Sequence, residues 1–234
     1  MTWKPLSGRA LKQRVRELIK SPDFDLACLE LCRLPARQVI NPLFSFLYSQ
    51  DKEIKWAAVK AMGAIVARLA DEDMEAARGI MRRLMWNLND ESGGIGWGSP
   101  EAMGEILTCN ERLAKEYSHI LISYMRKNGN YLEYERLQRG LLWGIGRLSQ
   151  VRPHLLQNTV PLLLPYLESV DATVRGLAAW IMGLLEVEEA CSRLEMLKND
   201  KIEFEMYLDR KIIGCRVMDL AEQALQKIKS GYES

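Results

Sequence analysis

The chain of 234 residues has only two histidines, His119 and His154, and five scattered cysteines. Neither histidine lies near a cysteine, so the sequence lacks the clustered nitrogen and sulfur ligands of a zinc site. Cys28 and Cys32 are four residues apart and would share one helical face, but no activating neighbour is evident beside them. We therefore predict no metal, no cofactor and no catalytic residue, and a structural role for the cysteines.

Long apolar runs and an excess of either charge are also absent. No stretch approaches the roughly 18 apolar residues of a membrane span, and the first residues do not resemble a signal peptide. Lys and Arg total 32 against 31 for Asp and Glu, which gives a formal net charge of +1. This balance does not favour nucleic acid as a partner, although a local basic stripe would still allow it. We expect a cytoplasmic protein without a membrane partner.

One sequence pattern recurs along the chain. Segments 51–63 and 171–183 both read D-x-x-[IV]-[KR]-x-x-A-[AV]-x-x-M-G without a gap, and weaker copies end at Gly146 and Gln226. The alanines would let paired helices approach closely, and the leading Asp51 and Asp171 would cap the helix that follows. Internal repetition of this kind indicates a repeat fold.

The stretch ESGGIGWGSPEAMG, residues 91–104, raises the alternative of a phosphate-binding loop. A dinucleotide fingerprint would need a third glycine where Ser99 stands, and the preceding residues 76–89 have helical periodicity. The P-loop sequence Gly-Lys-Ser/Thr is also absent. The stretch instead aligns with the repeat, ending at Gly104, and Ser99-Pro100-Glu101 predicts a helix start with Ser99 as N-cap.

The motifs end at Gly63, Gly104, Gly146, Gly183 and Gln226, which are 41, 42, 37 and 43 residues apart. A period near forty fits a two-helix solenoid unit. A second amphipathic segment precedes each motif, with apolar residues three and four apart. These segments are 37–50, 73–89, 112–127, 152–169 and 188–199. Helix, turn and helix, repeated, predict an α-solenoid.

Residues 201–217 break the helical pattern. Ile202, Phe204 and Met206 alternate with Glu203 and Glu205, and a second β-branched run follows a polar turn. Period two predicts a β-hairpin inserted between the two helices of the last repeat. We favour a role in shielding the end of the stack; the alternative is a dimer or partner contact through a strand edge.

The motif resembles the HEAT repeat, particularly the short bacterial variety shared with phycobilisome-lyase-like repeat proteins, over roughly residues 35–230. The resemblance implies an all-α fold, an α-solenoid (α/α superhelix) of about five helix pairs, with the hairpin in the last. We expect a single domain over 1–234. Its parts would be an N-terminal cap (1–36), repeats at 37–70, 72–110, 111–150, 151–187 and 188–230, and the hairpin insertion at 201–217.

In HEAT-like stacks the second helix of each pair usually lines the concave side. Positions seven before, three before and one after the motif glycine lie four apart on one face of that helix. This set, the tryptophan stripe, holds four of the six tryptophans. The candidate partner-binding residues are Trp56, Lys60, Trp97, Glu101, Glu105, Arg139, Trp143, Arg147 and Trp180.

The stripe has two interpretations. Its tryptophans would either pack between layers or line a groove in which Glu101 and Glu105 face Arg139 and Arg147. We predict a non-catalytic scaffold or adaptor that binds a protein or peptide partner in the concave groove. The alternative is a ligand-handling enzyme, similar to bilin lyases or to HEAT-like DNA alkylation-repair glycosylases. The tandem tryptophan and acid pattern that we associate with those glycosylases is missing.

Overall fold

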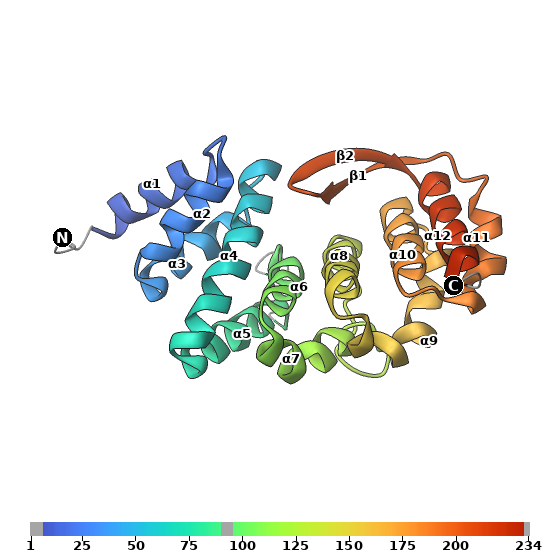
Figure 1. The fold of residues 1–234 in the computed structure, drawn as a ribbon, viewed down its shortest axis with the longest axis horizontal. Helices are drawn as coiled ribbons and strands as arrows, with labels where there is room; N and C mark the ends of the chain where they lie inside the picture. Colours follow the sequence, from blue (N-terminus) through green and yellow to red (C-terminus); the bar gives the residue numbers. More distant parts are fainter. Residues whose placement is uncertain (1–6, 90–95, 232–234) are drawn as a thin grey trace. The chain divides into compact units, whose positions relative to one another are not determined.

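The computed structural model describes residues 7–89 and 96–231. Its regular structure is helical apart from one two-stranded antiparallel hairpin near the C-terminus, which confirms the expected helical solenoid with a hairpin insertion (Figure 1). The chain divides into two compact units, Met1–Asn110 and Glu111–Ser234. The boundaries of the expected repeats stay predictions, and the expected loop 92–98 lies mostly outside the described residues.

The first unit begins with a helical hairpin that packs on the first repeat-like pair. Its helices are α1 (Gly8–Ile19), α2 (Phe24–Arg33), α3 (Ala36–Leu47), α4 (Lys52–Glu72), α5 (Met74–Leu88) and α6 (Ser99–Cys109). Apolar side chains at helical spacing, such as Leu43 on α3 and Met62 on α4, are fully buried between these helices. The Asp51 carboxylate accepts from the backbone N–H groups of Glu53 and Ile54, at 3.0 and 3.2 Å, and so caps α4 as expected.

The start of α6 differs from the sequence prediction. The cap position is occupied by Gly98 in the left-handed region, at φ 79°, and Ser99 is already the first helical residue. A Cβ on Gly98 would lie 2.8 Å from the Cβ of Leu47, so both the backbone conformation and the space require glycine. The prediction that Ser99 caps α6 is wrong, and its Oγ is buried without a hydrogen-bond partner among the described residues.

The second unit contains three helical pairs and the hairpin. Its elements are α7 (Glu111–Ser123), α8 (Glu135–Val151), η1 (Pro153–Thr159), α9 (Val160–Leu163), η2 (Leu164–Glu168), α10 (Ala172–Leu184), η3 (Glu188–Ala190), α11 (Cys191–Leu197), β1 (Glu203–Leu208), β2 (Lys211–Arg216) and α12 (Val217–Gly231). Helix α10 packs between α8 and α12 and is buried along most of its length.

The segment 152–169 was expected to form one helix, but it is broken into η1, α9 and η2. The sequence has a proline near the start of each of these pieces, at Pro153, Pro161 and Pro165. Because proline lacks a backbone N–H and its ring clashes with the preceding turn, each piece ends after one or two turns. The segment therefore stays helical, in three short pieces with 3-10 geometry at both ends.

The hairpin has a two-residue turn at Asp209 and Arg210, with φ of 47° and 64°. Left-handed backbone at both positions defines the type I′ turn, whose twist suits a tight hairpin. The register pairs Leu208 with Lys211 next to the turn and continues to Glu203 with Arg216. Within the second unit the hairpin extends over α8 and α10 on the side away from α7 and α9 (Figure 1).

None of the described helices is long and apolar enough to cross a membrane.

Candidate partner-binding site

In the first unit the two glutamates of the stripe on α6 form ion pairs with lysines of α4. Lys55 Nζ lies 2.5 Å from a carboxylate oxygen of Glu101, and Lys60 Nζ binds Glu105. Glu101 and Glu105 are 4% and 1% exposed, so both carboxylates are buried and their charges are met by lysine. Buried charges are tolerated only when paired, and these pairs lock α6 against α4. Lys55 was not among the candidate residues, although the motif has a basic residue at that position.

Trp56 and Trp97 in the same unit are half-buried. The ammonium group of Lys55 lies 4.8 Å from the centroid of the Trp56 ring, within the range of a cation–π contact. Lys55 therefore joins the Trp56 ring to the buried carboxylate of Glu101. The indole of Trp56 keeps part of its surface exposed on a helix that these contacts hold in place.

In the second unit the stripe tryptophans are buried. Trp143 and Trp180 are 2% and 9% exposed. The Trp143 indole N–H donates to the backbone carbonyl of Tyr207 on β1, at 2.7 Å, and the two rings lie 6.1 Å apart at 54°. Trp180 packs its ring on the motif glycine Gly146 of α8. A partner could reach the Trp143 indole only by displacing the hairpin.

The fourth copy of the stripe begins with Gly176 on α10, and the ring of Phe204 on β1 lies directly over it. A Cβ on Gly176 would come within 2.3 Å of the Phe204 ring. Phe204 and Met206 are 9% and 3% exposed, whereas Glu203 and Glu205 are exposed, so β1 presents its apolar face to the helices. The sequence shows this alternation, but it does not show that the strand would lie on the stripe.

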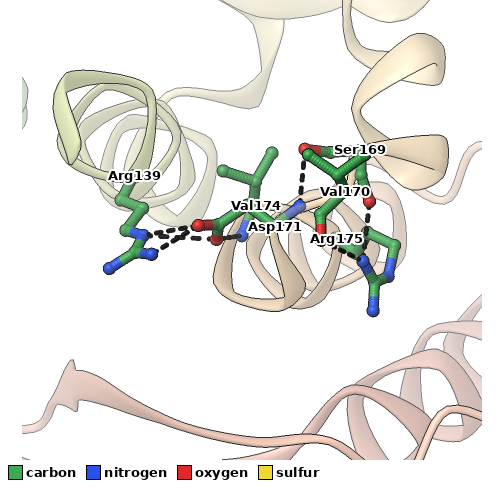
Figure 2. A network of polar contacts seen from close by, with 6 residues as sticks. All are labelled: Arg139, Ser169, Val170, Asp171, Val174 and Arg175. Carbon is green, nitrogen blue, oxygen red and sulfur yellow. Dashed lines mark hydrogen bonds and ion pairs between the residues drawn. The ribbon is translucent and has the colours of Figure 1, made fainter. Parts of the chain in front are cut away.

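Arg139, at the first stripe position of α8, binds the N-cap of α10. Its Nε lies 3.0 Å from a carboxylate oxygen of Asp171, and a second guanidinium nitrogen contacts the same carboxylate (Figure 2). Asp171 also accepts from the backbone N–H of Val174 at 3.0 Å. Burial alone would raise the pKa of Asp171, but the Arg139 guanidinium and the backbone N–H groups outweigh it and lower the pKa below its usual value.

Arg175 completes this network on the other side of the first turn of α10 (Figure 2). Its Nη1 donates to the backbone carbonyls of Ser169 and Val170, at 2.6 and 3.0 Å. Its Nε lies 2.8 Å from the carboxylate of Asp200, in the segment after α11. The basic position of the motif therefore reaches an acid of the next helix pair in both strong copies, Lys55 to Glu101 and Arg175 to Asp200.

Arg147, the last candidate of α8, is half-buried and donates to the side chain of Gln150. The expected contacts of Glu101 and Glu105 with Arg139 and Arg147 would join the two units and stay a prediction. Glu101 binds Lys55, and Arg139 binds Asp171. Neither Lys55 nor Asp171 was among the candidate residues.

The two thiols of α2 are close enough to interact. The hydrogen bond from Cys28 and the guanidinium of Arg68 lower the pKa of Cys32 to about 7, against the effect of burial. The same hydrogen bond and burial raise the pKa of Cys28. Arg68 is the activating neighbour that the sequence did not reveal, because it lies 36 residues away on α4. Among the described residues no group of three or more His, Cys, Asp or Glu is placed to hold a metal ion.

Comparison with known proteins places this geometry in a repeat class. A family model described as HEAT-like repeat matches residues 135–185, which contain α8, the broken segment and α10. This part of the chain is therefore similar to a HEAT-like repeat. An uncharacterised protein of Archaeoglobus fulgidus is 25% identical to this chain over 183 residues, covering 77% of the chain and 92% of that relative.

Solved structures of repeat proteins share the fold. A designed armadillo repeat protein in complex with the peptide (KR)4 has a TM-score of 0.51 at 18% identity, covering 93% of this chain and 99% of that one. An engineered protein gives 0.52 at 17% identity, covering 95% and 97%. A mutant of Kap121p gives 0.56 at 17% identity, covering 94% of this chain and 24% of that chain. At these identities the likeness shows the fold alone.

Proposed function

We propose that this chain is a non-catalytic, cytoplasmic scaffold that binds a segment of a partner protein on the tryptophan stripe. The observation that carries the proposal is the position of β1 on the stripe of the second unit. There an extended segment has one backbone carbonyl bound by the Trp143 indole and one aromatic side chain seated on Gly176. An extended polypeptide can therefore bind to the stripe through a backbone carbonyl and an aromatic side chain.

In the first unit we assign the partner-binding site to the stripe residues Trp56, Lys60 and Trp97. Trp56 and Trp97 are half-buried, and Lys60 keeps about a fifth of its side chain exposed beside Glu105. Tryptophan supplies large contact area with little loss of conformational freedom, and it is enriched at binding hot spots. A designed armadillo repeat protein of similar fold is found in complex with a peptide, which supports the class of function without naming the ligand.

The test compares two tryptophans of the first unit. Trp56→Ala removes a stripe residue, and Trp86→Ala removes a tryptophan on α5 that is 73% exposed and lies outside the stripe. Tagged full-length chains are used to capture proteins from a lysate of the source organism, with quantitative mass spectrometry. We expect a set of proteins that is captured by the parent and by Trp86→Ala, and that is depleted at least fivefold with Trp56→Ala.

The folded state of each variant is checked by circular dichroism and thermal unfolding before capture. Identical protein sets from both variants, with both variants folded, would remove Trp56 from the binding surface and contradict the proposal.

A further inference from the structure

The two strands of the hairpin differ in what their outer edges contact. In a hairpin with a two-residue type I′ turn, the residues that flank the turn form a hydrogen-bonded pair, and such pairs alternate along the strands. Leu208–Lys211 is therefore hydrogen-bonded, and Tyr207–Ile212 and Glu205–Gly214 are the alternate pairs. In these alternate pairs the backbone N–H and C=O groups point away from the partner strand. The Trp143 indole confirms this on β1, because it binds the outward carbonyl of Tyr207.

On β2 the same rule turns the backbone groups of Ile212 and Gly214 outward. Among the described residues no hydrogen bond reaches the N–H or C=O of either residue. Gly214 is exposed, and a Cβ at this position would meet no atom within 4 Å. β2 therefore presents an open sheet edge, the feature that natural proteins usually pair, cover or protect.

A cavity of about 600 Å³ lies beneath β2, between the hairpin and the helices α10 and α12. Its lining includes the apolar side chains of Trp180, Leu184, Met206 and Ile213, together with polar and charged residues of α12 such as Glu222 and Gln223. Ile213 keeps 38% of its surface exposed at this cavity, although it is a large aliphatic side chain. A strand added next to β2 would point every second side chain to the cavity side of the sheet.

The charges around this edge indicate the chemistry of the added strand. Asp219 holds Arg216 by two hydrogen bonds, and Glu222 lies in the field of the same guanidinium. Two exposed lysines form no ion pair within the described residues. They are Lys211, the first residue of β2, and Lys227, which lines the cavity. Two unmatched ammonium groups complement carboxylates on an incoming segment.

We propose that β2 binds an extended segment of a partner protein by strand addition. The segment would pair with the backbone of Ile212 and Gly214, place apolar side chains at alternate positions into the cavity, and carry acidic residues near Lys211 and Lys227. The hairpin and its cavity belong to the second unit, whereas Trp56 and Trp97 belong to the first, so this proposal does not rest on the proposed function.

A second copy of this chain fits the edge less well. In an antiparallel β2–β2 pair about Gly214, Ile213 and Cys215 of the second copy would face its own cavity and its own helices. The cavity beneath each β2 would stay unfilled. A partner segment can pair with the backbone of β2, and its side chains on the cavity side can fill the cavity.

The test uses the full chain and a fluorescent synthetic heptapeptide with valine at alternate positions and glutamate at both ends. Affinity is measured by fluorescence anisotropy, and amide hydrogen exchange is followed by NMR. We expect saturable binding, with exchange at Ile212 and Gly214 slowed at least tenfold at saturation. Backbone N-methylation of the peptide on the edge that faces β2 should abolish binding, and N-methylation of the opposite edge should leave it within about threefold.

A matched pair of variants tests the charge argument. Lys227→Glu should weaken peptide binding at least fivefold at low salt, whereas Lys229→Glu on the same helix should change it less than twofold. Absence of binding at 1 mM peptide, or binding without protection of Ile212 and Gly214, would overturn the proposal. So would a dimer, seen by analytical ultracentrifugation, that Gly214→Pro converts to monomer, since it would assign the edge to a second copy.

Discussion

The indole N–H of Trp143 on α8 donates a 2.7 Å hydrogen bond to the backbone carbonyl of Tyr207 on β1. These residues are 64 positions apart in the chain. The contact fixes β1 to α8, and it uses a backbone carbonyl that β2 leaves unpaired.

Replacing Trp143 by Phe should loosen the hairpin. The variant keeps an aromatic ring but leaves the buried carbonyl of Tyr207 without its donor, which costs about 1–3 kcal/mol. We expect a lower free energy of unfolding in urea and faster amide exchange in β1. The control is Trp86→Phe, which changes an exposed ring. A hairpin with unchanged amide exchange in Trp143→Phe would show that other contacts hold it.

Gly176→Ala should destabilise the protein although alanine is the better helix former. The added methyl group would overlap the Phe204 ring, and overpacking of this kind costs about 1–3 kcal/mol. The matched control is Gly79→Ala on α5, where the nearest atom is 3.8 Å from the added Cβ. That variant should be more stable by up to about 1 kcal/mol, because glycine is unfavourable within a helix. Thermal and urea unfolding of both variants check the two opposite signs.

Asp171→Asn should separate the ion pair with Arg139 from the capping of α10, because asparagine also caps helices. The pKa of Asp171 is lowered in the folded state, so the ionised carboxylate stabilises the protein above about pH 4, the range of the unfolded group. This stabilisation is lost as the pH falls from about 3.8 through the lower folded pKa. We expect a difference of about 1 kcal/mol from the parent at pH 7 that shrinks below pH 4. A difference that is constant from pH 7 to pH 3 would show that the charge of Asp171 is not its cause.

Cys32 should react with iodoacetamide at pH 7 faster than Cys28, because its pKa is lowered to about 7 and that of Cys28 is raised. Mass spectrometry of the alkylated peptides after short exposure measures both rates. Arg68→Gln should raise the pKa of Cys32 and slow its alkylation at pH 7. The difference from the parent should disappear near pH 9.5, where the thiol is ionised in both proteins. Equal rates at Cys28 and Cys32 at pH 7 would contradict the assignment.

The spacing of the repeat motifs predicted the helical solenoid, and the strict alternation from Ile202 to Met206 predicted the hairpin. Both features are local in the sequence: helical and strand periodicity decide which faces are apolar, and the aspartates at 51 and 171 set helix starts by capping. The apolar periodicity of segment 152–169 predicted one continuous helix, and it does not show that the three prolines divide the segment into short pieces.

The contacts of the stripe could not be predicted in the same way, because each joins residues that are far apart in the chain. Lys55 and Glu101 are 46 positions apart, and Arg139 and Asp171 are 32 apart. Sequence spacing places a side chain on a helical face, but it does not say which neighbouring helix or strand covers that face. Ser99 shows the same limit, since the close approach of Leu47 from α3 requires glycine at the cap position instead.

The sequence by itself determined the repeat, the helix pairs, the hairpin and the face on which the tryptophans lie, because each follows from periodicity and capping within a short segment. Only the tertiary structure decided that Trp143 is covered by the chain's own strand and that Trp180 packs on Gly146, while Trp56 keeps exposed surface. It also decided that the outer edge of β2 is open above a cavity. These outcomes depend on how separate elements pack, and packing is set by shape and by the pairing of buried polar groups across the fold.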